Sequence, residues 1–442
     1  MKQIFIVRAQ YLITMNKKDE VVENGAVVVE DGRIKDIAEF TEILKKYKDP
    51  SIPVYGNSHS ALMPGFINTH THAAMVLFRG IADDLPLKKW LTEHIWPRET
   101  KFLSPEFVYD GTLLASLEML KSGTTTFNDM YFFTESIAEA VKKLGIRAVI
   151  GQGVLDFPTA SGNGADDYLK KAEEFIEKYR SDELIIPAVA PHAIYTCSKE
   201  TLLKSKELAL KNSVPIHIHL SETFNEVEEC IKKHGKRPVK YLDDIGFLEG
   251  KITAAHSVWL DDEEIEIMAE RGIGVSHCIE SNLKLSSGVA PVARMIKKGV
   301  KVSMGTDGAA SNNNLDLLEE ISIAAKVQKG VTADPTVLDV KTCMKMLTVW
   351  AAEALGIDSE TGSIEIGKKA DMILMNLRKP HLQPVYDIYS TIIYSAKASD
   401  IEDVFVNGIP VILNGRHQFV DEDEIIDKAL WWAERIRNFC HF

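Results

Sequence analysis

The feature that most constrains this chain is the alternation of short apolar segments with amphipathic ones through its middle. Eight apolar segments have the length and composition of buried strands. They lie at residues 65–69, 124–128, 147–151, 185–190, 216–220, 252–255, 274–276 and 301–305. Helical patterns lie between strands at residues 136–144, 166–179, 199–211 and 261–271. Strands that alternate with helices form parallel sheets, because each return to the same edge needs a crossover.

Eight strand–helix units within about 250 residues are typical of a (β/α)8 barrel of the TIM type. A doubly wound sheet is the competing arrangement for the same pattern. It usually carries a glycine-rich phosphate loop after an early strand, and this chain has no such loop there. We therefore predict an α/β fold in which residues 61–365 form a (β/α)8 barrel that is the catalytic domain.

The two ends of the chain have strand and hairpin-turn signals instead. The strand segments are residues 4–7, 26–29 and 34–37 at one end and 371–374, 404–406 and 411–413 at the other. Neither set is long enough for a domain of its own. We predict that residues 1–60 and 366–442 combine into one small β-sandwich domain, with the termini meeting. A terminal helix carrying Trp431 and Trp432 is expected to pack on the barrel.

Charge and cysteine usage restrict the partners and the compartment. The chain has 64 acidic against 51 basic residues and a net charge of -13, which disfavours nucleic acid and anionic membranes. No apolar run reaches the roughly 18 residues of a membrane span, and the N-terminus lacks a signal-peptide pattern. The five cysteines form no CxxC pair, which is typical of reduced cytosolic thiols. We expect a cytoplasmic enzyme that acts on a small-molecule substrate. The same observations are compatible with a monomer or a homo-oligomer.

Ionisable side chains stand at the ends of four predicted strands. The first strand runs into His70 and His72, which share a face because residues two apart in a strand point the same way. His219 lies in the strand at 216–220, His256 follows the strand at 252–255, and Asp307 follows the strand at 301–305. Barrel enzymes place their catalytic groups at these strand ends.

Each of these residues has a structural alternative when taken singly. A histidine in a strand is more often a hydrogen-bonded core residue, and the glycine-flanked Asp307 is more often part of a turn. Together, such groups are costly to bury unless they share a partner such as a metal ion. The joint pattern therefore predicts a metal site.

These residues resemble the amidohydrolase superfamily. The matching segments are PGFINTHTH at 64–72, HIHLSET at 217–223, AHSVWL at 255–260, SNLKLSSGVAP at 281–291 and GTDGAASNNNLDL at 305–317. Within the superfamily the chain is similar to the 5-methylthioadenosine/S-adenosylhomocysteine deaminases. Close relatives of that family include 5'-deoxyadenosine deaminases, guanine deaminases and s-triazine chlorohydrolases.

The resemblance implies one metal ion per subunit. Its ligands are His70, His72, His219 and Asp307, which suit Zn²⁺ and would also accept Fe²⁺ or Mn²⁺. Binuclear relatives need a carboxylated lysine at the end of strand four. Here that strand ends at His192 without a lysine, which favours a single ion.

The resemblance also implies the catalytic residues. Asp307 and His256 orient a metal-activated water and accept its proton. Glu222 protonates the adenine ring nitrogen N1 while C6 is attacked, and ammonia leaves. Glu222 and Asp307 therefore also contact the substrate.

Further substrate residues are carried over from the same resemblance. Glu99 matches the family glutamate that binds the ribose hydroxyls, and its alternative is a solvated carboxylate. His192 matches a histidine that contacts the nucleoside, and its alternative is a structural histidine. Trp90 would cover the adenine face, or it is a core tryptophan. His217 is expected to fill the barrel or to support the ligands from behind.

Some positions depart from the family pattern. Ser257 replaces a common cysteine, and residues 277–282 lack the usual proline. The loop at 153–158 contains none of the arginines that hold a homocysteine carboxylate in some members. This favours 5-methylthioadenosine or 5'-deoxyadenosine over S-adenosylhomocysteine. Guanine deamination or chlorohydrolysis is the alternative activity, and a non-catalytic scaffold is disfavoured because every ligand is present.

Overall fold

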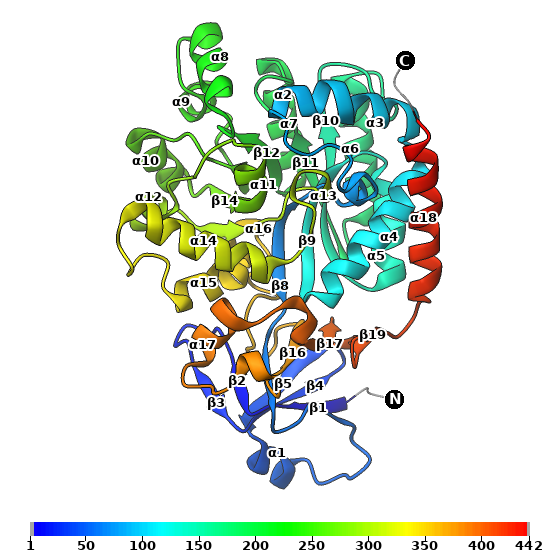
Figure 1. Ribbon diagram of the computed structural model, residues 1–442, viewed down its shortest axis with the longest axis vertical. Helices are drawn as coiled ribbons and strands as arrows, with labels where there is room; N and C mark the ends of the chain where they lie inside the picture. The colour runs from blue at the N-terminus through cyan, green and yellow to red at the C-terminus, as the bar shows by residue number, and fades with distance from the viewer. Residues whose placement is uncertain (1–3, 440–442) are drawn as a thin grey trace.

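The fold is built around eight parallel strands in a computed structural model that describes residues 4–439 (Figure 1). The strands pair in chain order from β8 to β15. Their bounds are β8 (Phe66–Thr71), β9 (Thr124–Tyr131), β10 (Arg147–Val154), β11 (Ile185–Pro191), β12 (Ile216–Leu220), β13 (Ile252–His256), β14 (Gly274–His277) and β15 (Val302–Met304). All eight predicted strands are confirmed, and so is the TIM-type barrel.

Side chains and a backbone bond complete the barrel between its first and last strands. The Thr69 hydroxyl on β8 donates to the carbonyl of Met304 on β15, at 2.9 Å. Just beyond the strands, the backbone N–H of Asp307 donates to the carbonyl of His70, at 3.0 Å. This closure brings the two ends of the barrel sequence together at one rim.

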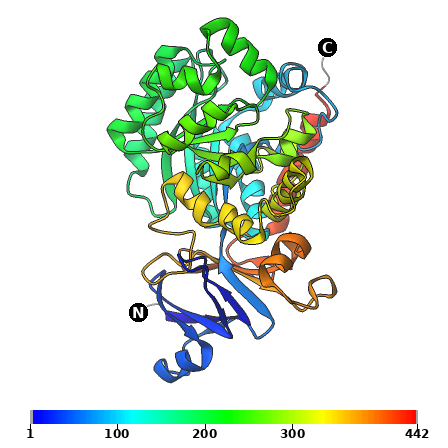
Figure 2. The same ribbon diagram turned by 90° about the vertical axis from the view of Figure 1, so that its left-hand side faces the viewer.

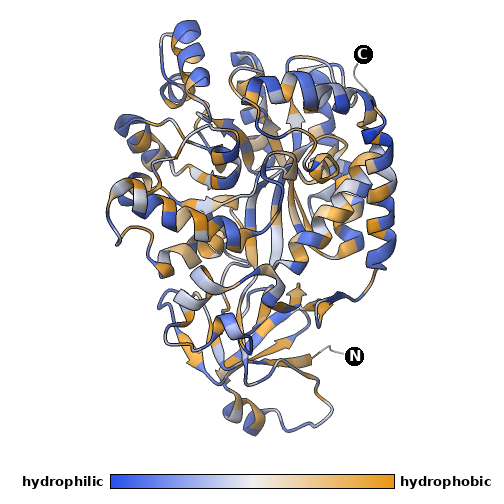
Figure 3. Ribbon diagram, in the orientation of Figure 1, coloured by the Kyte–Doolittle hydropathy of each residue, from blue (hydrophilic) through white to orange (hydrophobic). Residues whose placement is uncertain are grey.

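Helices cover the outside of the barrel, and the hydropathy colours show their polar and apolar sides (Figure 3). The longer ones are α4 (Pro105–Lys121), α5 (Thr134–Leu144), α6 (Ala165–Tyr179), α7 (Lys199–Asn212), α8 (Phe224–His234), α10 (Asp262–Arg271) and α14 (Leu317–Thr332). The four predicted helices are among them. The residues at the two ends of α10 explain its bounds. Asp261 and Glu264 form a capping box at its start, and Gly272 ends the helix with a positive φ.

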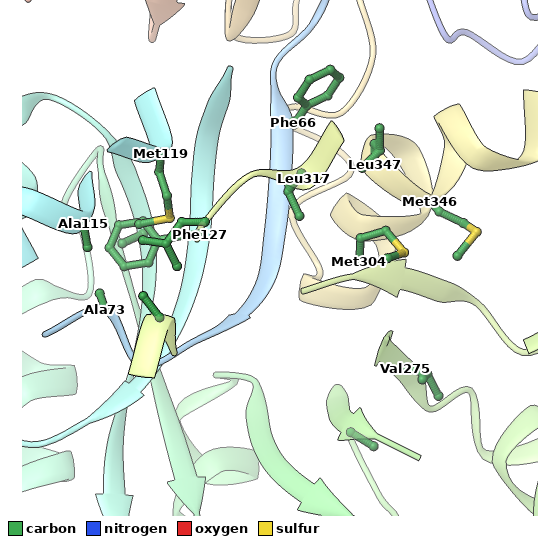
Figure 4. Packing of buried hydrophobic residues seen from close by; sticks show 14 of the residues in the cluster. Phe66, Ala73, Ala115, Met119, Phe127, Val275, Met304, Leu317, Met346 and Leu347 are labelled. Atoms are coloured by element: carbon green, nitrogen blue, oxygen red, sulfur yellow. The ribbon is translucent and has the colours of Figure 1, made fainter. Parts of the chain in front are cut away.

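Shorter helices complete the barrel layer and the loops. They are α2 (Leu87–Lys89), α3 (Trp96–Phe102), α9 (Pro238–Asp244), α11 (Ile279–Lys284), α12 (Val292–Lys297), α13 (Ala309–Asn312), α15 (Val340–Leu347) and α16 (Val349–Leu355). A π-helical segment, Trp90–Ile95, joins α2 to α3. Beneath them, Phe66, Met304 and Leu347 belong to the continuous core drawn in Figure 4.

A smaller β domain lies below the barrel in both views (Figures 1 and 2). One sheet has the order β5-β4-β1-β6, and the other has the order β19-β18-β17-β16-β7-β2-β3. The N-terminal elements are β1 (Ile4–Arg8), β2 (Tyr11–Ile13), β3 (Val21–Glu23), β4 (Gly25–Glu30), β5 (Arg33–Glu39), α1 (Phe40–Lys46), β6 (Val54–Tyr55) and β7 (Ser60–Pro64). The C-terminal ones are β16 (Met372–Asn376), α17 (Ile388–Ser390), β17 (Ile401–Val406), β18 (Ile409–Leu413) and β19 (Arg416–His417).

The two sheets share one apolar core, to which Phe5, Leu62 and Phe405 all belong. The composite β domain is therefore confirmed, but its pairing differs in detail from the expectation. The predicted N-terminal strands lie in a sheet of their own, with the order β5-β4-β1-β6. Among the C-terminal strands, β16 pairs with β7, a short strand that was not predicted.

The described ends of the chain lie at opposite ends of the molecule (Figure 1). This differs from the expectation that the two termini meet in the β domain. Helix α18 (Glu422–Arg437) leaves the β domain and runs up the barrel beside α4 (Figure 1). The Trp432 indole N–H donates to Asp110 on α4 at 2.8 Å. The expected packing of this helix on the barrel is confirmed.

A buried ion pair joins the barrel to the β domain. Arg147, at the start of β10, donates from Nε to the Asp371 carboxylate beside β16, at 2.9 Å, and both side chains are buried. Among the described residues, no helix is long and apolar enough to cross a membrane.

Candidate active site

Two imidazoles at the barrel rim have their orientation fixed from behind. The Nδ1 of His72 lies 2.7 Å from the carbonyl oxygen of Met130, and the Nδ1 of His219 lies 2.8 Å from that of His192. A carbonyl oxygen can only accept, so both Nδ1 atoms carry hydrogen. The two Nε2 atoms then face each other with lone pairs, 3.2 Å apart. Neutral imidazoles hold that arrangement only around a cation.

His70 adds a third nitrogen to this cluster. Its Nε2 is buried without a hydrogen-bond partner and lies 3.4 Å from Oδ1 of Asp307. Its Nδ1 lies 2.8 Å from Nε2 of His217, so His217 supports His70 from behind as the sequence suggested. Burial lowers the pKa of His70 to about 4, which keeps its imidazole neutral and able to bind a metal.

Asp307 supplies a carboxylate that is held ionised. Its Oδ2 accepts hydrogen bonds from the hydroxyls of Ser281 and Ser311, at 2.7 and 3.1 Å, and its Oδ1 accepts from the backbone of Gly308 at 2.7 Å. Burial alone would raise the pKa of Asp307. The neighbouring histidines, His70 first, outweigh burial and hold the pKa well below its usual value.

The described residues therefore fit a metal ion. Ligand atoms of His70, His72 and His219 lie within 4.8 Å of one another, and those of His70, His256 and Asp307 do the same. Neutral imidazoles with one carboxylate are the donor set of catalytic zinc sites. The orphaned Nε2 of His70 is the clearest sign of a missing partner.

His256 and Glu222 form a second pair beside the ligand cluster. Nε2 of His256 lies 3.8 Å from Oε2 of Glu222. Behind them, Nδ1 of His256 lies 2.9 Å from Oδ1 of Asn282, and the Ser287 hydroxyl donates to Oε1 of Glu222 at 2.9 Å. Burial would lower the pKa of His256, but the carboxylates of Glu222 and Asp307 outweigh it and raise the pKa.

One cavity of about 270 Å³ joins these groups to the predicted substrate residues. All nine predicted site residues contribute to this region, and all except His70 line the cavity itself. The lining members are His72, Trp90, Glu99, His192, His219, Glu222, His256 and Asp307. The structure thus brings together residues from seven separate segments of the chain.

The substrate candidates are held in place by neighbours. Oε1 of Glu99 accepts a hydrogen bond from the Tyr131 hydroxyl at 2.6 Å, and burial raises the pKa of Glu99. Nδ1 of His192 lies 2.9 Å from the Thr196 hydroxyl, and burial lowers the pKa of His192 to about 3. Trp90 is only 5% exposed and still lines the cavity.

Several supporting residues were missed or understated. Tyr131 had no sequence signal, because its partner lies on another segment. Ser287 lies in the matching segment at 281–291 but was given no role. Asn282 lies in a segment that matches the family but was given no role, and it orients His256. Glu226 had one weak signal, its position four residues after Glu222 at the start of a helix.

A barrel with imidazole and carboxylate donors at the carboxyl ends of its strands is the architecture of metal-dependent hydrolases. The chain belongs to the amidohydrolase family, whose model matches residues 61–411. The resemblance drawn from the sequence motifs is thereby confirmed.

Individual relatives are similar over nearly the whole chain. The 5-methylthioadenosine/S-adenosylhomocysteine deaminase of Thermodesulfovibrio yellowstonii is 88% identical over 438 residues, which cover 99% of this chain and 100% of that protein. The 5'-deoxyadenosine deaminase of Methanosarcina acetivorans is 46% identical over 98% of both chains. The crystal structure of an adenosine deaminase from Xanthomonas campestris with bound zinc has a TM-score of 0.96 at 38% identity, covering 98% of this chain and 99% of that one.

Proposed function

We propose that this protein is a metal-dependent deaminase of 5'-substituted adenosines. It adds water at C6 of the adenine ring and releases ammonia, which leaves the inosine analogue. The proposed substrates are 5-methylthioadenosine, 5'-deoxyadenosine and S-adenosylhomocysteine. The observation that carries the proposal is the single cavity shared by a metal-ligand cluster, the Glu222–His256 pair, and Glu99 with His192. The 88% identical deaminase supports it.

His70, His72, His219 and Asp307 would hold one Zn²⁺, and Fe²⁺ or Mn²⁺ would also suit these donors. A bound metal of this kind supplies Lewis-acid activation of water at neutral pH. A lysine that could bridge a second ion is absent from β11, which favours one metal per subunit.

The protein's own residues move the protons. Asp307 and His256 face the same space and would accept the proton of the attacking water. Glu222 would deliver a proton to ring nitrogen N1 as water adds at C6. The proton accepted by Asp307 or His256 would then pass to the amino group, which leaves as ammonia, while the new C6 hydroxyl returns its proton to Glu222 and becomes the carbonyl. Its Oε1 is occupied by Ser287, which leaves Oε2 for transfer toward the cavity.

The nucleoside would be held by its sugar and its base. The Glu99 carboxylate suits the ribose hydroxyls, because carboxylate oxygens accept two hydrogen bonds from neighbouring O–H groups. His192 would contact the nucleoside with the ring nitrogen not engaged by Thr196, and Trp90 would cover the adenine face.

The outer wall of the cavity favours an apolar 5' group. Leu87, Leu91, Trp96 and Phe157 line it, and none of the described lining residues is a lysine or arginine. The charged end of S-adenosylhomocysteine would lose hydration there without gaining a charged partner. We therefore expect 5-methylthioadenosine and 5'-deoxyadenosine to be the better substrates.

Two other readings make different predictions. Guanine deamination or chlorohydrolysis would not need a ribose-binding carboxylate such as Glu99. A non-catalytic barrel would not need a complete ligand set beside a proton-transferring pair.

We further propose that the protein works in the cytoplasm, and a homo-oligomer remains compatible with this site.

Ammonia release from zinc-loaded protein tests the proposal. The panel is 5-methylthioadenosine, 5'-deoxyadenosine, S-adenosylhomocysteine, adenosine and guanine, each followed also by ultraviolet absorbance. Turnover of the 5'-substituted adenosines, with S-adenosylhomocysteine lowest among the three, is expected. Metal binding without ammonia release from any nucleoside would refute the deaminase assignment.

A further inference from the structure

We propose that Glu226 is a positioning residue for Glu222. Its buried carboxylate fixes the peptide that carries the proton-transferring side chain. The inference rests on the proposed role of Glu222, and nothing in that role requires a second glutamate. Glu226 is not among the described residues that line the cavity, so any effect on catalysis would pass through Glu222.

The contacts of Glu226 are unusually complete for a side chain that touches no substrate. Glu226 is the third residue of α8, and its side chain turns back along the chain. One carboxylate oxygen accepts the backbone N–H of Ser221 at 2.9 Å, and the other accepts that of Glu222 at 2.8 Å. The side chain of Thr223 accepts the N–H of Glu226 itself at 3.2 Å. The loop between β12 and α8 is thereby tied at two consecutive peptides.

This arrangement differs from the ordinary use of a glutamate at that helix position. In a capping box the third residue binds the N–H of the capping residue, as Glu264 of α10 does with Asp261. Glu226 instead passes over the capping residue Thr223 and reaches the two residues before it. Its bonds therefore serve the Ser221–Glu222 loop rather than the helix end.

The loop needs such support because its backbone is strained. Ser221 has a φ of +52°, in the left-handed region that disfavours residues with a Cβ. A carboxylate that accepts two N–H groups offsets this strain. Burial raises the pKa of Glu226 to about 7, and the Ser221 and Glu222 amides work against that rise.

Glu222 is then held at both ends. Glu226 fixes its backbone, and Ser287 holds its Oε1. Its Oε2 is left beside the cavity, 3.8 Å from Nε2 of His256. A displacement of about 1 Å at a reacting group can cost about 100-fold in rate, so loosening the peptide would lower turnover more than binding.

The test compares Glu226→Gln with Glu264→Gln. Glutamine keeps one acceptor oxygen and presents an NH2 group to the other N–H, so one of the two bonds is lost. We expect kcat for 5-methylthioadenosine to fall about 10- to 100-fold, with KM within about twofold and metal content unchanged. Glu264 is a matched control, because it is also buried at the third position of a helix that follows a barrel strand. Glu264→Gln should lower Tm and leave kcat unchanged.

A double-variant cycle shows whether the effect passes through Glu222. Adding Glu226→Gln to Glu222→Gln should change the residual turnover by less than about threefold. An unchanged kcat in Glu226→Gln, or an equal loss in both backgrounds, would overturn the inference. Full activity of Glu222→Gln would instead overturn the proposed function. If Glu226→Gln does not fold, Glu226→Asp should show a smaller kcat loss, and an unchanged kcat would again overturn the inference.

Discussion

At the scale of single residues, the direction of buried donors decides what this site can do. His72 and His219 each commit Nδ1 to a carbonyl, and Asn282 engages Nδ1 of His256. Each ring therefore presents Nε2 to the cavity. Partners of this kind usually matter nearly as much as the ligands they orient.

Replacing Glu222 separates proton transfer from metal binding. Glu222→Gln should retain the metal, because Glu222 is not a proposed ligand, and should lower kcat by about 10²- to 10⁴-fold. Steady-state kinetics and metal analysis of the same preparation measure both effects. Glu228→Gln, an exposed change on the following helix α8, should leave kcat unchanged. An unaltered kcat in Glu222→Gln would remove its acid role.

His277 predicts part of the acid sensitivity of the fold. Both of its ring nitrogens are buried without partners, and burial lowers its pKa from 6.5 to about 3. Well above pH 6.5 the histidine is neutral in both the folded and the unfolded protein, so it does not affect the free energy of unfolding. As pH falls from 6.5 toward 3, only the unfolded protein takes up the proton, so the free energy of unfolding falls. Between pH 6.5 and 5 this group should lower the free energy of unfolding by about 1.6 kcal/mol.

His277→Leu removes that titration. Its unfolding free energy, measured with urea, should fall less between pH 6.5 and 5 than that of the unmodified protein. The same variant at pH 8 provides the baseline for any change in packing. Equal slopes in both proteins would show that His277 is not buried in its neutral form.

At the scale of elements, the barrel and the β domain depend on contacts between segments distant in sequence. β7 comes before the barrel and β16 after it, yet they pair in one sheet. The Arg147–Asp371 pair lies where β10 meets this domain. Removing one partner of a buried ion pair leaves the other charge without compensation.

Arg147→Met should therefore lower the unfolding free energy by about 3 to 5 kcal/mol. Chemical denaturation at pH 7 measures it. Arg294→Met is a control, because its ion pair with Asp262 is exposed and should contribute less than about 1 kcal/mol. A loss no larger than that of the control would mean that the interdomain pair carries little of the stability.

At the scale of the whole molecule, barrel closure brings together the proposed metal ligands. His70 on the first barrel strand and Asp307 after the last one lie side by side only when the barrel is complete. A metal bound by both would therefore oppose unfolding of the entire barrel. Binding to the native state alone adds stability that grows with free metal concentration.

Zinc added to chelator-treated protein should raise its Tm, with a gain of about 4 kcal/mol at a free concentration 1,000 times Kd. Differential scanning calorimetry across a zinc series measures this. Mg²⁺, which prefers oxygen ligands in an octahedral shell, should give little shift. Asp307→Asn should reduce the zinc-dependent gain, and an undiminished gain would place the metal elsewhere.

Much of the barrel was predictable from local patterns. Strands such as β11 and β13 are largely apolar segments, and helices such as α5 and α6 have one apolar and one polar side. The short strands β2, β3 and β7 escaped because they are stabilised by neighbours rather than by their own composition. The described ends of the chain lie apart, contrary to the expectation, because no local pattern shows where a terminal helix will pack.

The strand–helix alternation, and the ionisable residues at the strand ends, can be read from local patterns, because periodicity and residue type are local properties. Which atoms of those residues face one another depends on the folded barrel. It turned Nε2 of His72 toward Nε2 of His219, brought Asp307 beside His70, and tied the Glu222 peptide to Glu226. These relations join segments through barrel closure and loop geometry, so no single stretch of the chain contains the information that sets them.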